Sequence, residues 1–154
     1  LDAKYEAKQI TVEGCTFLGS QAPIAFVGVK EATVRYNTIV RPEKWVMRIL
    51  QETRDPDFLV CGNNRFEQNL IVFRRSDVNV FVNIGPGTNP ETFTFAHNLW
   101  YCEDRPEASR PQLPSVETGG VYGRDPRLRT MASGHLSPDD AMASRYGATA
   151  WKSK

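Results

Sequence analysis

The sequence predicts an all-β solenoid, and two observations lead to that fold class. A short phrase recurs in which an apolar residue precedes two residues, a polar turn residue, one further residue and a second apolar residue. Runs of β-branched and aromatic residues lead into each phrase, and such runs favour strands. The phrase occupies residues 12–17, 34–39, 61–66 and 95–100.

The spacing of the phrases predicts stacked coils. The turn positions are Cys15, Asn37, Asn64 and Asn98, which are separated by 22, 27 and 34 residues. A period of twenty-odd residues with lengthening insertions is typical of a solenoid, in which each repeat is one coil of chain. Asparagine tolerates left-handed backbone, so each Asn is expected to turn the strand sharply. In register, the buried Asn amides would lie about 4.8 Å apart and hydrogen-bond to one another.

A second strand is predicted about ten residues after each of the first three phrases. These runs cover 24–29, 45–50 and 70–74, and they are more continuously apolar than a sheet with one wet face would be. One coil therefore contains a strand, a loop, a strand, the Asn turn and a short strand, which makes it three-sided. The fourth coil, 70–102, carries the largest insertion, with a further strand-like run at 78–84.

The pattern stops after Cys102, which divides the chain into coils at 1–102 and a tail at 103–154. Proline-rich segments of the tail argue against further regular sheet. We expect an irregular cap that packs back over the last coil, with Trp151 as an anchor. A short helix is predicted over 136–144, with Ser137 as its N-cap.

The phrase with Asn in its bend resembles the right-handed parallel β-helix repeat of the pectate-lyase-like superfamily, over roughly residues 9–102. The tail stretch 123–128, with 136–138 behind it, resembles tails that close many secreted bacterial β-helix proteins. The resemblance implies a three-sided right-handed parallel β-helix of about four coils. It also implies a secreted protein, extracellular or periplasmic, whose polysaccharide substrate lies along the outer face of one sheet. Cys15 replaces Asn in the first coil, so the Asn ladder is expected to end there.

Four residues are candidates for substrate binding. Strand alternation places Arg48 and Arg74 on the outer face, and they follow their Asn by 11 and 10 residues, so we expect them on adjacent coils. A uronic-acid carboxylate would suit such a pair, since arginine binds carboxylates in a bidentate manner. Arg41 and Glu52 are expected nearby. The alternative is that these arginines are surface residues paired with acidic neighbours. No catalytic residue is identified.

Metal and cofactor signals are weak. Asp55 and Asp57 can offer oxygens to calcium, which many proteins of the resembled family use, but ordinary turn chemistry of an Asp beside a proline is the first interpretation. No Cys/His spacing suits zinc, and no other cofactor is predicted. His97 precedes a turn Asn, where a surface position is the first interpretation and a general base the second.

Composition limits the partners. The 154 residues carry a net charge of +1 and no apolar run long enough to span a bilayer, so neither nucleic acid nor membrane is indicated. The three cysteines leave at least one thiol unpaired within the chain. An uncovered first coil would expose strand edges, so we expect it to meet further N-terminal coils or a second chain.

Three functional hypotheses follow. The first is the C-terminal part of a secreted β-helix that acts on polysaccharide as a lyase of acidic glycans. The second is a non-catalytic β-helix that binds glycan or stiffens a cell-surface assembly. The third is an intracellular solenoid that uses its free cysteines.

Overall fold

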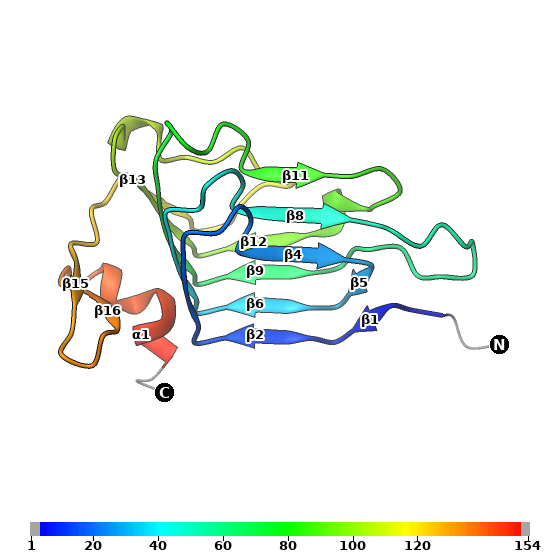
Figure 1. Cartoon of the computed structure of the whole chain (residues 1–154), viewed down its shortest axis with the longest axis horizontal. Coiled ribbons are helices and arrows are strands. Elements are labelled where there is room, and N and C mark those ends of the chain that lie inside the picture. Colours follow the sequence, from blue (N-terminus) through cyan, green and yellow to red (C-terminus); the bar gives the residue numbers. More distant parts are fainter. Residues whose placement is uncertain (1–3, 152–154) are drawn as a thin grey trace.

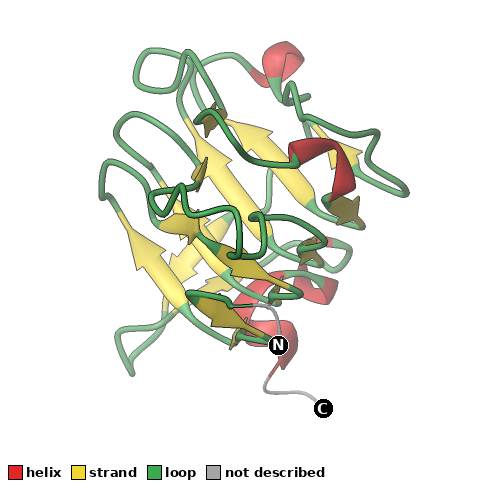
Figure 2. Ribbon diagram, turned by 90° about the vertical axis from the view of Figure 1, so that its right-hand side faces the viewer, coloured by secondary structure: helices red, strands yellow, loops and turns green. Residues whose placement is uncertain are grey.

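The computed structural model describes residues 4–151 and contains three parallel sheets, which the chain visits in the same order on successive circuits (Figure 1). We name each sheet after its first strand. The predicted all-β class with parallel sheets is confirmed, and the arrangement is compatible with a β-helix. Figure 2 shows that loops connect the sheets and that the helical segments are short.

The strands are short, and their bounds are as follows. The β2 sheet contains β2 (Thr11–Glu13), β6 (Thr33–Arg35), β9 (Arg65–Glu67) and β12 (Thr94–Ala96). The β3 sheet contains β3 (Thr16–Leu18), β7 (Thr38–Val40), β10 (Leu70–Phe73), β13 (Leu99–Cys102) and β14 (Val121–Tyr122). The β4 sheet contains β4 (Ile24–Val27), β8 (Met47–Leu50) and β11 (Val82–Ile84).

Two further strand pairs and four short helices complete the described residues. The strand pairs are β1 (Ala7–Lys8) with β5 (Val29–Lys30), which is parallel, and β15 (Leu128–Thr130) with β16 (Leu136–Pro138), which is antiparallel. The helices are η1 (Pro90–Thr92), η2 (Pro106–Ala108), η3 (Ala143–Arg145) and α1 (Gly147–Trp151).

The core consists of apolar columns that run through successive circuits. In the β2 sheet the register aligns Val12, Val34, Phe66 and Phe95. The neighbouring column in the β3 sheet is Phe17, Ile39, Ile71 and Trp100. Each fully buried large side chain of this kind contributes roughly 1.5–3 kcal/mol, so the stacking of circuits supplies most of the stability of short strands.

One corner has a constant length and the other two do not. From the β2 column to the β3 column the chain runs 12 to 17, 34 to 39, 66 to 71 and 95 to 100, five residues each time. From the β4 sheet back to the β2 sheet it runs 24 to 34, 47 to 66 and 82 to 95, which is 10, 19 and 13 residues. Insertions therefore collect between the β4 and β2 sheets.

We call the corner of constant length the Asn corner. It shows that the third phrase was assigned to the wrong residues. Its buried column is Asn37, Asn69 and Asn98, not Asn37, Asn64 and Asn98. The amide of Asn37 donates to Oδ1 of Asn69 at 3.2 Å, and the amide of Asn69 donates to Oδ1 of Asn98 at 3.1 Å. The ladder ends at Cys15, as predicted: its backbone N–H donates to Oδ1 of Asn37.

Asn64 lies at a different corner, where its side chain also forms hydrogen bonds to the previous circuit. Its Oδ1 accepts from the backbone N–H of Ala32 at 2.8 Å, and its amide donates to the carbonyl of Val29 at 3.0 Å. The third phrase is therefore residues 66–71, which also fits the pattern of an apolar residue, two residues, Asn, one residue and an apolar residue.

The sharp turn falls on the residue before each corner Asn, which also departs from prediction. Gly14, Tyr36, Gln68 and His97 have φ of 69°, 52°, 54° and 53°, whereas the three corner asparagines are not in the left-handed region. The physical reason is that the Asn side chain must face inward to join the ladder, so its neighbour adopts the conformation that reverses the strand.

Because the third phrase is residues 66–71, the run 70–74 does not lie in the sheet that was predicted for it. Strand β10 pairs with β7 and β13 in the β3 sheet, and the partner of β8 in the next circuit is β11, within the predicted strand-like run 78–84. Met47 and Ile49, the neighbours of Arg48 in β8, are both fully buried, which agrees with the alternation that places Arg48 on the outer face.

Glu117 closes the Asn ladder at its far end. Its Oε1 accepts from the Asn98 amide at 2.7 Å, and its Oε2 accepts from the Trp100 indole at 3.0 Å and the Tyr122 hydroxyl at 2.9 Å. Burial, together with the hydrogen bond to Glu117, raises the pKa of Tyr122 to about 12. A carboxylate suits this position because every group that faces it is a donor.

The tail reaches the last circuit through β14 and then runs back along the outer face of the β3 sheet. There Leu70, Val72 and Leu99 pack with Ala143 of η3 in a second apolar cluster. Helix α1 lies against β7 and β10, and Trp151 stacks near Tyr36 with ring centroids 6.1 Å apart. The helix predicted over 136–144 is wrong: residues 136–138 form β16, because they pair with β15.

Candidate functional site

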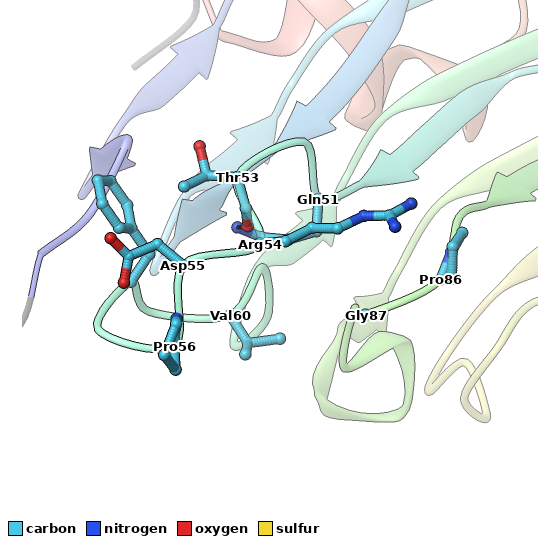
Figure 3. A pocket seen from close by; sticks show the side chains of 9 residues that line it. Gln51, Thr53, Arg54, Asp55, Pro56, Val60, Pro86 and Gly87 are labelled. Atoms are coloured by element: carbon cyan, nitrogen blue, oxygen red, sulfur yellow. Dashed lines mark hydrogen bonds between the residues drawn. The ribbon is translucent and has the colours of Figure 1, made fainter.

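One hollow lies where the longest insertion leaves the β4 sheet. We call it the loop hollow; it has a volume of about 440 Å³ and is lined by residues between 51 and 60, after β8, and by Pro86 and Gly87, after β11 (Figure 3). These two segments leave the same sheet on successive circuits, so the hollow lies at the carboxyl ends of β8 and β11. Loops at strand ends are where binding residues commonly gather.

The base of the loop hollow is fixed by hydrogen bonds. The Gln51 side chain accepts from the backbone N–H of Cys61 at 2.8 Å and donates to the carbonyl of Thr53 at 3.1 Å. The N–H of Thr53 donates to the carboxylate of Glu6 at 3.0 Å. The carbonyl of Cys61 accepts from Asn89, which ties the first loop to the second. These hydrogen bonds hold the loop after β8 and the loop after β11 at a fixed separation.

Arg54 supplies positive charge to this hollow. It is exposed and has no hydrogen-bond or ion-pair partner among residues 4–151. Figure 3 shows its guanidinium extending toward the loop of Pro86 and Gly87, while the Asp55 carboxylate points away from it. Asp55 instead faces the Lys4 ammonium at 3.8 Å and accepts from the N–H of Asp57 at 2.9 Å. Within the described part of the chain, Arg54 therefore faces the hollow without a counterion.

Arg48 lies on the outer face of β8, as predicted, but not beside Arg74. Its register partner in the next circuit is Asn83, whose Oδ1 accepts from the Arg48 Nε at 3.0 Å. The guanidinium also lies 4.9 Å from the ring centroid of Trp45, and Lys44 lies over the same ring at 4.4 Å. Arg48 retains donors that can meet an anion on this face.

Arg74 meets Arg41 instead, and a carboxylate already lies between them. Glu103 accepts from Arg41 Nε at 2.8 Å and from Arg74 Nε at 3.0 Å. The hydrogen bond from Arg41, with a further contribution from Arg74, holds the pKa of Glu103 below its usual range. The same bond raises the pKa of Arg41. Two stacked arginines with an anion across them were expected, and here the anion comes from the chain itself.

Glu52 is exposed in the loop that follows β8. Arg41 directly follows β7 and therefore lies before β8 in the chain. The four predicted binding residues thus occupy two groups, Arg41 with Arg74 before the β4 sheet and Arg48 with Glu52 on and after it. Whether any of them binds substrate stays a prediction.

No cluster of three or more His, Cys, Asp or Glu side chains suitable for a metal occurs within residues 4–151. Asp55 and Asp57 share the Lys4 ammonium, at 3.8 and 3.4 Å, and the suggestion that they bind calcium stays a prediction. His97 is exposed at the Asn corner and His135 is exposed in the tail. All three cysteines are free, and burial raises the pKa of the Cys61 and Cys102 thiols.

Arg54 was not among the binding residues predicted from the sequence. The available signal was an arginine shortly after a predicted strand and next to Asp-Pro-Asp, in a chain with 19 Lys and Arg residues. Only the packing of the second loop against the first distinguishes it.

No model of a known protein family, no curated protein and no solved structure matches this chain. Among the described residues, no helix is long and apolar enough to cross a membrane.

Proposed function

We propose that this chain is a right-handed parallel β-helix that binds an acidic polysaccharide in the loop hollow without cleaving it. The observation that carries the proposal is Arg54, an arginine that has no counterion among residues 4–151 and faces a hollow between two braced loops. The volume of about 440 Å³ falls within the range usual for ligand sites. An extracellular or periplasmic location, where such polymers occur, belongs to the same proposal.

The chemistry of the hollow suits a uronic acid residue. A guanidinium binds a carboxylate through two parallel hydrogen bonds, which are among the strong ones because both partners are charged. Phe58 and Pro86 offer apolar surface to the C–H face of a sugar ring, and Thr53 offers a hydroxyl. Asp55 also lines the hollow, but its carboxylate points away from Arg54 and faces the Lys4 ammonium at 3.8 Å, which weakens its repulsion of an anionic ligand.

Binding without cleavage is favoured over a lyase by the state of the other cations. β-Elimination next to a carboxylate needs a base to remove the proton and a cation to stabilise the resulting charge. Arg41 and Arg74 already share Glu103, and Arg48 lies on the outer face of β8 rather than in the loop hollow. Arg54 is the one cation among the residues that line the loop hollow. In this hollow Arg54 alone would have to hold the substrate carboxylate and stabilise the charge that elimination creates.

The test is calorimetric titration with a galacturonic acid hexasaccharide and with its methyl ester, which has the same shape and no charge. We expect binding of the acid, at least tenfold weaker binding of the ester, and no unsaturated product. Arg54→Gln should weaken binding of the acid roughly tenfold, the loss of one bidentate charged contact. The matched control is Arg105→Gln, an exposed arginine 4.0 Å from Glu107 and far along the chain.

Equal effects of Arg54→Gln and Arg105→Gln would contradict the assignment of the site. Absence of binding by the unmodified protein would overturn the function itself. Release of a product with a carbon–carbon double bond would favour the lyase hypothesis instead.

A further inference from the structure

The first circuit leaves one end of the three sheets open. Strands β2, β3 and β4 are the outermost strands of their sheets at this end. Between them lies an apolar hollow of about 380 Å³, which we call the end hollow, lined by side chains that include Val12, Phe17, Ile24 and Phe26. Ile10, at its rim, is 47% exposed. An apolar opening surrounded by strand edges is a feature of protein interfaces.

The backbone at this end has unused hydrogen-bonding groups. The Ile10 carbonyl accepts from Thr33, and the Gly14 N–H donates to Tyr36, so these residues of the first circuit face the second. In a parallel strand alternate residues bond to opposite sides, so the groups of Thr11 and Glu13 face outward. By the same argument Thr16 and Leu18 of β3 face outward, since Cys15 and Gly19 bond to β7 residues.

At the opposite end the chain itself covers two of the three sheets. Thr118 exchanges backbone hydrogen bonds with Phe95 and His97 along the edge of β12. Strand β14 covers β13, and Glu117 ends the Asn ladder. Leu113 and Pro114 line a hollow together with residues of β11. A head-to-tail contact between two copies would therefore bring three open strand edges against an end at which two of the three sheets are already covered.

We propose that a second copy of this chain covers the end hollow, with the two open ends face to face. A two-fold axis places each apolar hollow over the other, and the facing edge strands run antiparallel, so their outward backbone groups can pair. A net charge of only +1 per copy opposes this contact weakly. Because two of the three sheets are covered at the far end, the assembly is expected to stop at two copies.

The experiment is sedimentation velocity on the full chain over a hundredfold concentration range, with a reducing agent present so that the exposed Cys15 forms no disulfide. We expect a species of twice the monomer mass. Ile10→Lys places a charge in the mouth of each end hollow and should raise the dimer dissociation constant at least tenfold. Since Ile10 is already half-exposed, its replacement should leave the circular dichroism spectrum unchanged.

The matched control is Val80→Lys, because Val80 is 52% exposed and lies beside β11 at the opposite end. It should leave the dimer intact. Phe17→Lys is a second variant within the end hollow, for which the dimer should also be lost. A monomer at every concentration would overturn the proposal, as would assemblies that grow beyond two copies or a Val80→Lys variant that dissociates like Ile10→Lys.

Discussion

At the scale of single residues, the buried amides of the Asn corner hydrogen-bond successive circuits to one another. Asn69 takes part in four side-chain hydrogen bonds: it accepts two from Asn37 and donates to Val34 and Asn98. Each bond joins one circuit to the next, and no buried side-chain N or O atom within residues 4–151 lacks a partner. The asparagines therefore fix the register of the stack as well as satisfying their own amides.

Replacement of Asn69 should cost more than replacement of Asn64. Both are fully buried, but Asn64 makes two strong hydrogen bonds, to Ala32 and Val29. We expect Asn69→Ala to lower the free energy of unfolding by about 3 kcal/mol and Asn64→Ala by about 2 kcal/mol, since each orphaned buried partner costs about 1 kcal/mol or more. Urea unfolding measures both; a larger effect at Asn64 would contradict the ladder.

The sequence could predict the ladder but not its third member. Asn64 and Asn69 are five residues apart, and both fit the phrase with apolar neighbours at the required positions. The choice between them depends on which strand pairs across the stack, and local composition holds no information about that. Because the third phrase was assigned five residues too early, Arg74 was predicted to lie beside Arg48, whereas it directly follows β10 in the β3 sheet.

At the scale of elements, the tail is held to the β3 sheet by a close approach of backbone. Gly147 has φ of 77°, and a Cβ there would lie 2.5 Å from Oγ1 of Thr38. That hydroxyl accepts from the N–H of Ala148 at 3.0 Å. Thr38 is almost fully buried, so it cannot move aside freely. Glycine is required here both for conformation and for space.

Gly147→Ala should release α1 from the sheet, because it adds a steric clash to about 1 kcal/mol of backbone strain. Hydrogen exchange should speed up in residues 143–151, while β10 stays protected. Gly134→Ala is the matched control: its φ is 79°, but nothing lies within 4 Å of the added Cβ. Similar exchange in the two variants would show that the contact with Thr38 does not hold the tail.

Element-level prediction succeeded where the pattern was repeated and failed where it was not. The strands that lead into and out of the Asn corner were predicted from the β-branched and aromatic residues around the repeated phrase. The helix proposed at 136–144 rested on Ser137 as an N-cap, a local signal that was outweighed by pairing of Leu136 with Thr130. The loop hollow depends on two loops meeting, so its residues could not be selected from either loop alone.

At the scale of the whole molecule, acid should weaken the attachment of the tail. Arg124 makes two 2.7 Å hydrogen bonds to Asp140, whose carboxylate also accepts from Ala143. The Arg124 guanidinium holds the pKa of Asp140 well below its usual range. A carboxyl group with a lowered folded-state pKa contributes stability above its unfolded pKa, about 4, and that contribution is lost as the pH falls toward the folded value.

Asp140→Asn should therefore destabilise the protein at neutral pH, and the difference from the unmodified protein should shrink below about pH 4. Urea unfolding at several pH values measures it. Asp77→Asn, at an exposed aspartate, provides the control and should have little effect at any pH. A destabilisation by Asp140→Asn that persists unchanged in acid would show that the charge of Asp140 is not what stabilises the tail.

The constant five-residue Asn corner and the variable corner between the β4 and β2 sheets have a consequence for how such a chain can change over generations. A deletion of one residue at the Asn corner would turn the side chains of a whole strand to the opposite face, so the packing of every circuit constrains the length there. Between the β4 and β2 sheets, segments of 10, 19 and 13 residues are accommodated by one core. A lineage can therefore acquire a new recognition surface by insertion at one edge alone, and a designer can graft loops there without repacking the interior.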